Sequence, residues 1–212
     1  MKITKLVHSC LLVEMPEPTN RTVLFDPGSM SHELIEQHDF AYLDDIVITH
    51  NHGDHLDVDV IRQLVAKFPD VRILATAQAI DQLKEQGIAA TNIAPEGLTI
   101  FDSEHAPTEP LFDTPQQHGI HYLGQLTHPG DSHTFGETMP ILALPVQAPW
   151  GATVNAVKLA LQLRPQYIIP IHDWHWSEDA RAAMYQTLET TFKQHNITFI
   201  KPVNGEPFVI DI

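Results

Sequence analysis

A stretch of six residues carries the densest set of side chains that can bind a metal ion. It contains His50, His52, Asp54 and His55. Alternate residues of an extended chain point the same way, so His50 and His52 can converge on one ion. Gly53 permits a sharp turn, which would let Asp54 and His55 face a second position nearby. Imidazole and carboxylate groups bind zinc, and also manganese or iron, so the spacing predicts a metal site.

A site for two metal ions needs further ligands from elsewhere in the chain. His105, Asp131 and His172 are the candidates, because each follows an apolar run typical of a strand and stands at a turn. Turns at strand ends are where side chains can reach a site at the edge of a sheet. His118 or His128 could take the place of His105.

The apolar pattern predicts the elements that must position these residues. Short apolar runs bounded by turn residues indicate strands at 11–13, 23–25, 45–49, 71–74, 98–101, 120–123, 125–128, 141–144, 167–171, 197–200 and 208–210. Helical spacing indicates helices at 57–68, 77–86, 152–163 and 177–195, the last with Ser177 as its N-cap. Many strands with helices at several places favour two sheets packed face to face and covered by helices. We expect one domain spanning residues 1–212.

Composition narrows the class of protein. The chain has 27 acidic and 12 basic side chains and a formal charge of −15, which offers no basic footprint for a nucleic acid or an anionic membrane. Cys10 is the only cysteine, so a metal site must use histidines and carboxylates, and Cys10 itself is expected to be a small buried hydrophobe. The start of the sequence lacks the features of a secretory signal, so a cytoplasmic location is expected.

The ordered set of motifs resembles the metallo-β-lactamase-fold hydrolase superfamily over nearly the whole chain. The set contains Phe25–Gly28, the His-x-His-x-Asp-His signature at His50–His55, a later histidine, a Gly-Asp pair and a histidine that closes a strand. Three segments are similar to the branch of cytoplasmic hydrolases that includes sugar-lactone lactonases, namely His8–Cys10, Gly130–His133 and Ile169–His172. Gly130–His133 in particular resembles the pattern of ascorbate-phosphate lactonases.

The resemblance implies an α/β fold, a four-layer αββα sandwich with the site at one edge and two divalent metal ions bound there. Carried over by position, the ligands would be His50, His52 and His105 for the first ion, Asp54, His55 and His172 for the second, and Asp131 for both. Asp26 would hold a ligand histidine in place. Zinc is the expected metal, with manganese and iron as alternatives.

Other residues have two readings. In the resembling branch the position of His8 faces the metal cleft, but His8 could equally be a core histidine bonded to the backbone. His133 would contact substrate if the lactonase likeness holds, and otherwise lies in a solvated loop. Trp150, Trp174 and Trp176 could wall a substrate pocket or pack a loop onto the sheet.

The expected activity is hydrolysis of a small ester or lactone by a metal-bound hydroxide. Metal binding lowers the pKa of water from 15.7 to about 7, and Asp54 would orient the nucleophile and accept a proton. The expected partner is a small-molecule substrate, and assembly into a homo-oligomer stays open.

Two alternatives use the same ligands. A phosphodiesterase or ribonuclease would need cationic side chains near the metals. None stands beside the ligand motifs in the sequence, although folding could bring Lys158 or Arg164 close to them. A di-iron oxidoreductase of this fold usually adds a flavin domain and has a carboxylate within the first motif, where this chain has Asn51 and Gly53. A non-catalytic metal-binding relative would be expected to lack one or more ligands.

Overall fold

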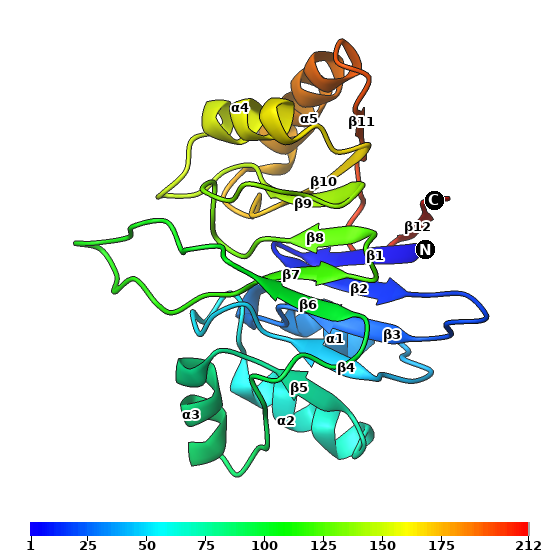
Figure 1. Ribbon diagram of the computed structural model, residues 1–212, viewed down its shortest axis with the longest axis vertical. Coiled ribbons are helices and arrows are strands. Elements are labelled where there is room, and N and C mark those ends of the chain that lie inside the picture. Colours follow the sequence, from blue (N-terminus) through cyan, green and yellow to red (C-terminus); the bar gives the residue numbers. More distant parts are fainter. Residues whose placement is uncertain (212) are drawn as a thin grey trace. The chain divides into compact units, whose positions relative to one another are not determined.

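The chain divides into two compact units. The computed structural model describes residues 1–211, and the units are Met1–Pro95 with Val203–Ile212, and Glu96–Pro202. Within the described residues each unit contains one six-stranded sheet and its own helices (Figure 1). The single domain expected over residues 1–212 stays a prediction.

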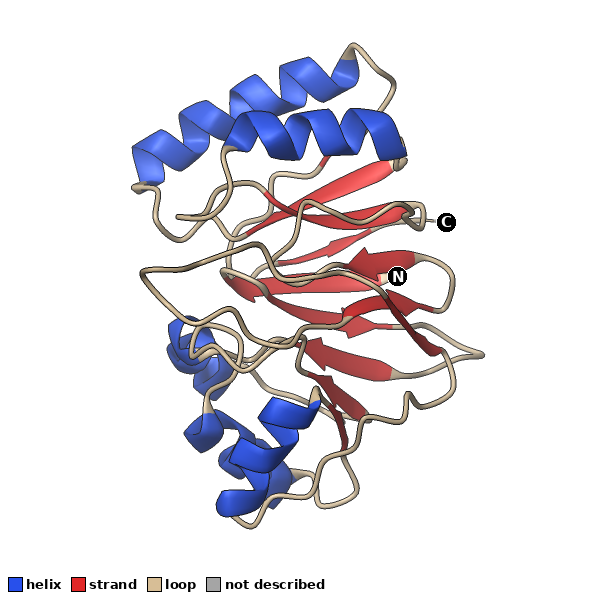
Figure 2. Ribbon diagram, turned by 60° about the vertical axis from the view of Figure 1, so that its left-hand side comes forward, coloured by secondary structure: helices blue, strands red, loops and turns tan. Residues whose placement is uncertain are grey.

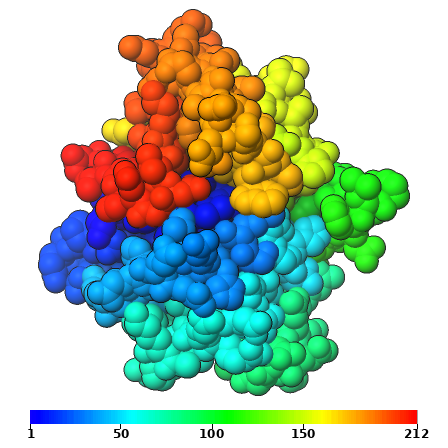
Figure 3. Space-filling view, turned by 180° about the vertical axis from the view of Figure 1, so that it is seen from behind, coloured from blue at the N-terminus to red at the C-terminus, as the bar shows by residue number. Residues whose placement is uncertain are grey.

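The sheet of the first unit is mixed. Its strands lie in the order β12 (Pro207–Val209), β1 (Lys2–Val7), β2 (Cys10–Glu14), β3 (Thr22–Phe25), β4 (Asp45–Val47) and β5 (Arg72–Leu74). The pairs from β12 to β3 are antiparallel, whereas β3, β4 and β5 are parallel. In Figure 3 the C-terminal residues, in red, lie against the N-terminal residues, in blue, as the pairing of β12 with β1 requires. The carboxyl ends of β1, β3 and β4 therefore meet at one edge of this sheet.

Two of the three α-helices of the first unit begin at side-chain caps. They are α1 (His32–Gln37), α2 (Val58–Lys67) and α3 (Ala77–Glu85), preceded by the short 3-10 helix η1 (Ser29–Ser31). The Asp57 carboxylate caps α2 by accepting from the backbone N–H groups of Asp59 and Val60, and the Thr76 hydroxyl caps α3 by accepting from that of Ala79. Such caps satisfy donors that lack a partner within the helix.

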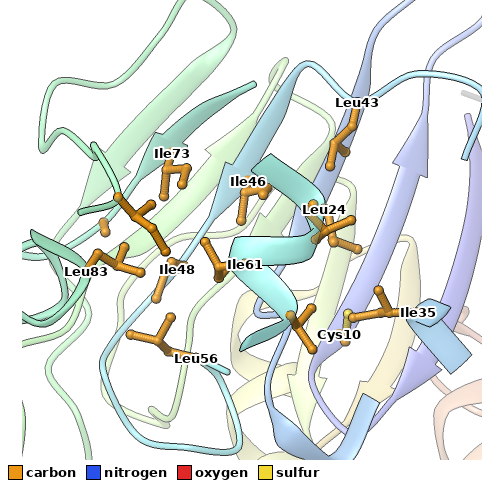
Figure 4. Close-up of a cluster of buried hydrophobic side chains, with 14 of the residues drawn as sticks. Cys10, Leu24, Ile35, Leu43, Ile46, Ile48, Leu56, Ile61, Ile73 and Leu83 are labelled. Atoms are coloured by element: carbon orange, nitrogen blue, oxygen red, sulfur yellow. The ribbon is translucent and has the colours of Figure 1, made fainter. Parts of the chain in front are cut away.

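One apolar cluster joins these helices to their sheet. Figure 4 shows Ile61 of α2 beside Ile46 of β4, and Leu83 of α3 beside Ile48. Cys10 belongs to the same cluster and is 1% exposed, so the expectation of a buried thiol is confirmed. Its burial raises the pKa of the Cys10 thiol well above the ordinary range, because the charged form would lose its hydration.

The second unit repeats the arrangement of a sheet with helices. Its strands lie in the order β11 (Thr198–Phe199), β10 (Tyr167–Ile171), β9 (Ile141–Pro145), β8 (Leu126–His128), β7 (Gly119–Tyr122) and β6 (Leu98–Phe101). β8 to β11 are parallel, and β7 is antiparallel to both of its neighbours. The carboxyl ends of β6, β8, β9 and β10 consequently lie at the same edge of this sheet.

Two helices cover one face of that sheet. Figure 2 shows α4 (Thr153–Leu163) and α5 (Glu178–Lys193) side by side over the strands. Ala156 of α4 and Leu188 of α5 pack with Leu142 and Ile168 of the strands in a second apolar cluster. The Ser177 hydroxyl caps α5, as predicted, by accepting from the N–H of Ala180.

The elements predicted from the apolar pattern are confirmed to within two residues at each end, but β1 and α1 were not predicted. β1 contains Lys5, whose side chain is fully buried although lysine is seldom buried. α1 has six residues and buries only Ile35 among them, so it leaves almost no helical period to detect. None of the helices in residues 1–211 combines the length and the apolar character needed to cross a bilayer.

Candidate metal centre

The first unit gathers its candidate residues at one edge of its sheet. His8 follows β1, Asp26 follows β3, and the loop from His50 to His55 follows β4. These strands run in the same direction, so the three segments that leave them are neighbours. Nε2 of His8 lies 3.2 Å from Oδ2 of Asp54, which brings the start of the chain to the histidine motif.

Three candidate residues hold a backbone conformation that L-amino acids rarely adopt. φ is +56° at His8 and +44° at Asp26 in the first unit, and +62° at His172 in the second. Such a conformation costs about 1–3 kcal/mol and persists only where the surrounding structure enforces it. Strain of this kind is often found at functional sites. Asn20, Leu123, Arg164 and Asn196 share the positive φ outside the motifs, so this conformation accompanies the candidate residues but does not by itself identify them.

The Asp26 carboxylate orients two of the histidines. Oδ1 accepts from the backbone N–H of Thr49, while Oδ2 accepts from the Thr49 hydroxyl and from Nδ1 of His55, each at 2.8 Å. Because the Thr49 hydroxyl donates to Asp26, its oxygen accepts from Nδ1 of His50, at 3.1 Å. Both rings are thereby fixed with Nε2 as the nitrogen that can bind a metal ion, which is how ligating histidines are commonly held.

The loop from His50 to His55 presents its donors at close range. The rings of His50 and His55 are fully buried, and their centroids are 4.0 Å apart. Ligand atoms of His8, Asp54 and His55 lie within 4.8 Å of one another, and so do those of His50 and His52. Nitrogen and carboxylate donors at these separations fit a divalent cation, whose charge would offset the cost of burying them together.

Gly28, rather than Gly53, is the glycine that this loop requires. A Cβ on Gly28 would lie 1.9 Å from the carbonyl oxygen of Asp54 and 2.5 Å from the nitrogen of His55. Gly53 has no left-handed φ, and a Cβ there would meet nothing within 4 Å. The chain does turn at Gly53, as expected, but no contact or backbone angle requires glycine there, whereas the close approach of Gly28 constrains the backbone of Asp54 and His55.

The second unit places its own three candidates at the corresponding edge of its sheet. His105 lies beyond β6, Asp131 beyond β8 and His172 directly after β10. Oδ2 of Asp131 is 2.8 Å from Nε2 of His172 and 3.7 Å from Nε2 of His105. This unit therefore brings together the three residues predicted at its strand ends.

Backbone carbonyl groups orient the two histidines of the second unit. Nδ1 of His105 donates to the carbonyl oxygen of Ala106 at 2.6 Å, and Nδ1 of His172 donates to that of Gln147 at 2.9 Å. Their Nε2 atoms face Asp131 in consequence. In both units Nδ1 is held by an oxygen and Nε2 is presented, the arrangement expected of metal ligands.

The alternative histidines occupy different surroundings. His128 is buried, and its Nδ1 accepts from the N–H of Gly130 at 3.4 Å. His118 is half-buried, and its burial lowers the pKa of the imidazole. Of the three histidines considered for the first ion, His105 is the one with its Nε2 beside Asp131.

His133 and Trp150 lie beside Asp131 and its neighbours. Nε2 of His133 donates to the carbonyl oxygen of Pro145 at 2.7 Å, and burial lowers the pKa of this imidazole. The indole N–H of Trp150 donates to Oδ2 of Asp131 at 3.1 Å. Trp174, in contrast, is 51% exposed.

The roles of Thr49, Gly28 and the Trp150 indole were not predicted from the sequence. Thr49 stands directly before the histidine motif, and its hydroxyl was the one feature of the sequence that could have indicated a hydrogen bond to a ligand histidine. The approach of Gly28 to Asp54 joins residues that are far apart in the chain, so it depends on the fold. No sequence pattern reports such a contact.

Comparisons with known proteins match most of this chain. A family described as "Beta-lactamase superfamily domain" matches residues 2–172, a range that includes every candidate ligand. Protein Rv0786c of Mycobacterium tuberculosis is 33% identical over 202 residues, covering 89% of this chain and 91% of that protein. A UPF0173 metal-dependent hydrolase of Thermofilum pendens is 25% identical over 191 residues, covering 81% and 82%.

A solved structure shows the same fold. Igni18, a metallo hydrolase of Ignicoccus hospitalis, superposes with a TM-score of 0.71 at 18% identity and covers 99% of both chains. This likeness confirms the predicted metallo-β-lactamase fold, and the family match together with the relative named a metal-dependent hydrolase confirms the predicted class of enzyme. The chain belongs to the metallo-β-lactamase superfamily, which includes relatives named metal-dependent hydrolases.

Proposed function

We propose that the chain hydrolyses a small ester or lactone with the aid of two divalent metal ions, of which zinc is the expected species. The proposed ligands are His50, His52, Asp54 and His55 in the first unit, and His105, Asp131 and His172 in the second. The observation that carries the proposal is the buried Asp26 carboxylate, which orients His55 directly and His50 through Thr49.

The donor set fits such ions. Four of the five proposed histidine ligands have Nδ1 held by a hydroxyl, a carboxylate or a carbonyl oxygen, which leaves Nε2 as the ligand atom. Imidazole and carboxylate ligands without thiolates suit zinc, manganese or iron. Cys10 is packed in the apolar core, consistent with a centre that uses no sulfur ligand.

Asp54 and His8 are the residues proposed to accept and transfer a proton. Bound divalent ions would lower the pKa of water from 15.7 to about 7 and polarise the scissile carbonyl group. Asp54 is partly exposed, with 24% of its side chain accessible, so its carboxylate can meet both a ligand and solvent. Nε2 of His8 hydrogen-bonds to the same carboxylate, so we assign His8 to the orientation of Asp54 and to the transfer of its proton.

An ester or lactone is favoured over a phosphodiester by the placement of Arg164, one of the two basic side chains considered. Arg164 ends α4 and precedes β10, whereas His172 follows β10 at the other end of that strand. A strand of five residues spans about 17 Å, so Arg164 lies at the sheet edge opposite to His172. The lactonase-like branch and the substrate contact assigned to His133 are part of the same proposal.

The test combines metal analysis with a substrate panel. Purified protein should contain two zinc ions per chain and hydrolyse lactones or carboxylic esters in preference to bis-p-nitrophenyl phosphate. Chelation, His52→Ala and Asp54→Asn should each abolish turnover. His195→Ala, at an exposed histidine beyond α5, is the matched control and should retain full activity.

Two results would reject the proposal. Full turnover by metal-free protein would remove the metal ions from the mechanism. A preference for the phosphodiester would be compatible with the metal ions but would show that the proposed class of substrate is wrong. The cytoplasmic location, the absence of a nucleic-acid or membrane partner and assembly into a homo-oligomer stay predictions.

A further inference from the structure

Gln117 lies near the start of β7, the strand that pairs with both β6, which leads to His105, and β8, which leads to Asp131. It stands just before β7, and β7 separates β6 from β8 in the sheet of the second unit. β6 and β8 both run antiparallel to β7, so their carboxyl ends meet the start of β7 at one edge. A side chain at position 117 can therefore reach the segments that leave both flanking strands.

The Gln117 amide bonds to both of those segments. Nε2 donates to the carbonyl oxygen of Ser103 at 2.9 Å and to that of Pro129 at 3.1 Å. Oε1 accepts from the backbone N–H of Asp131 at 2.6 Å. An amide combines two donor hydrogens with an acceptor oxygen, so glutamine satisfies all three backbone groups at once.

The backbone of Gly130 is shaped to this side chain. Its φ is +65°, and a Cβ at this position would lie 2.6 Å from both Cδ and Oε1 of Gln117. The turn before Asp131 therefore packs directly on the Gln117 amide, and glycine is the residue that permits the contact. The hydroxyl of Ser103 also donates to the carbonyl oxygen of Pro129 at 2.7 Å, joining the same two segments.

We propose that Gln117 is a positioning residue that sets the placement of Asp131 relative to His105 and thereby the metal affinity of the second unit's ligands. The inference rests on the proposed function, because it takes His105 and Asp131 to be ligands. Gln117 acts through the backbone N–H of Asp131, which belongs to the same residue as the carboxylate. Loss of a group that orients a ligand typically weakens metal affinity by about 10- to 100-fold.

The experiment titrates metal-free protein with Co²⁺, whose visible absorption reports the geometry of its ligands. Gln117→Met removes all three hydrogen bonds at similar volume. Gln117→Glu keeps the acceptor but brings a carboxylate to the carbonyl oxygens of Ser103 and Pro129. Both variants should bind Co²⁺ about 10- to 100-fold more weakly, with an altered visible spectrum. Gln186→Met and Gln186→Glu, on the exposed face of α5, are the matched controls and should titrate like the wild type.

The unfolding midpoint of the metal-free proteins separates positioning from simple stabilisation. If the Gln117 variants unfold at lower temperature but bind Co²⁺ with wild-type affinity and spectrum, Gln117 is only structural and the inference fails. In that case the proposed function stands, because the wild type still binds its metal. A wild-type protein that binds no Co²⁺ would instead overturn the proposed function and this inference together.

Discussion

Nδ1 of His55 lies 2.8 Å from Oδ2 of Asp26, and both side chains are fully buried. The same carboxylate holds Thr49 by two hydrogen bonds, and Thr49 in turn accepts from His50. One buried anion thus sets the orientation of two candidate ligands in the same loop. A partner of this kind fixes the tautomer of a histidine and raises its basicity toward the metal.

Replacement of Asp26 by asparagine should weaken metal binding while it leaves the size of the side chain unchanged. The asparagine would keep the size of the side chain but lose its charge and one of its acceptor oxygens. We expect metal affinity to fall by about 10- to 100-fold, measured by titration of the metal-free protein with Zn²⁺. Asp39→Asn changes the same group at an exposed position and should leave the titration unchanged. Equal affinities in the two variants would refute the orienting role of Asp26.

Alanine substitutions at Gly28 and Gly53 should differ in their effect on the free energy of unfolding. Gly53 belongs to the loop from His50 to His55, and Gly28 contacts the backbone of the same loop. A Cβ on Gly28 would overlap the backbone of Asp54, so Gly28→Ala should lower the free energy of unfolding by about 1–3 kcal/mol. Gly53 is exposed and has open space around it, so Gly53→Ala should change that free energy by less than about 0.5 kcal/mol. Urea unfolding of the metal-free proteins measures both, and a larger loss for Gly53→Ala would contradict the geometry.

His32 should make part of the stability depend on pH. Hydrogen bonds to Asp57 and then Glu36 raise the pKa of His32 above its ordinary value of 6.5. Protonated His32 therefore stabilises the folded state below the unfolded-state pKa, and this contribution is lost as the pH rises through the folded-state pKa. His32→Gln should be less stable than the wild type at about pH 5.5, and the difference should shrink toward about pH 8.5. Solvent screens these exposed groups, so the effect is small, and urea unfolding across that range measures it. A difference that grows with pH would have the wrong sign.

The sequence predicted the candidate metal ligands best where they are close together in the chain. The motif from His50 to His55 and the strand-end positions of Asp131 and His172 follow from residue type and local pattern alone. Asp26 was identified through the family resemblance, and the structure shows the contact with His55 that the resemblance implied, while the role of His55 as a ligand stays a prediction.

The rest depends on contacts between distant segments. Gly28 matters because it touches the backbone of Asp54, and Gln117 because β7 separates β6 from β8. β1 was missed for a different reason, since its Lys5 is buried against the ordinary preference of lysine for solvent. Local pattern reports which face of a strand is apolar, but it does not report which turn will pack against it.

The indole of Trp150 should take part in metal binding rather than only wall a pocket. Its N–H donates to Oδ2 of Asp131, a carboxylate that is 2% exposed. A hydrogen bond to a charged group contributes about 1.5–3 kcal/mol, so Trp150→Phe should weaken Zn²⁺ affinity by about tenfold or more. Tryptophan fluorescence gives a second readout, because metal bound at Asp131 would change the surroundings of this indole. The change in emission on Zn²⁺ addition should disappear in Trp150→Phe and persist in Trp174→Phe, whose side chain is 51% exposed. If Trp150→Phe keeps both the affinity and the change in emission, the hydrogen bond to Asp131 has no role in the metal centre and Trp150 serves only to pack the loop.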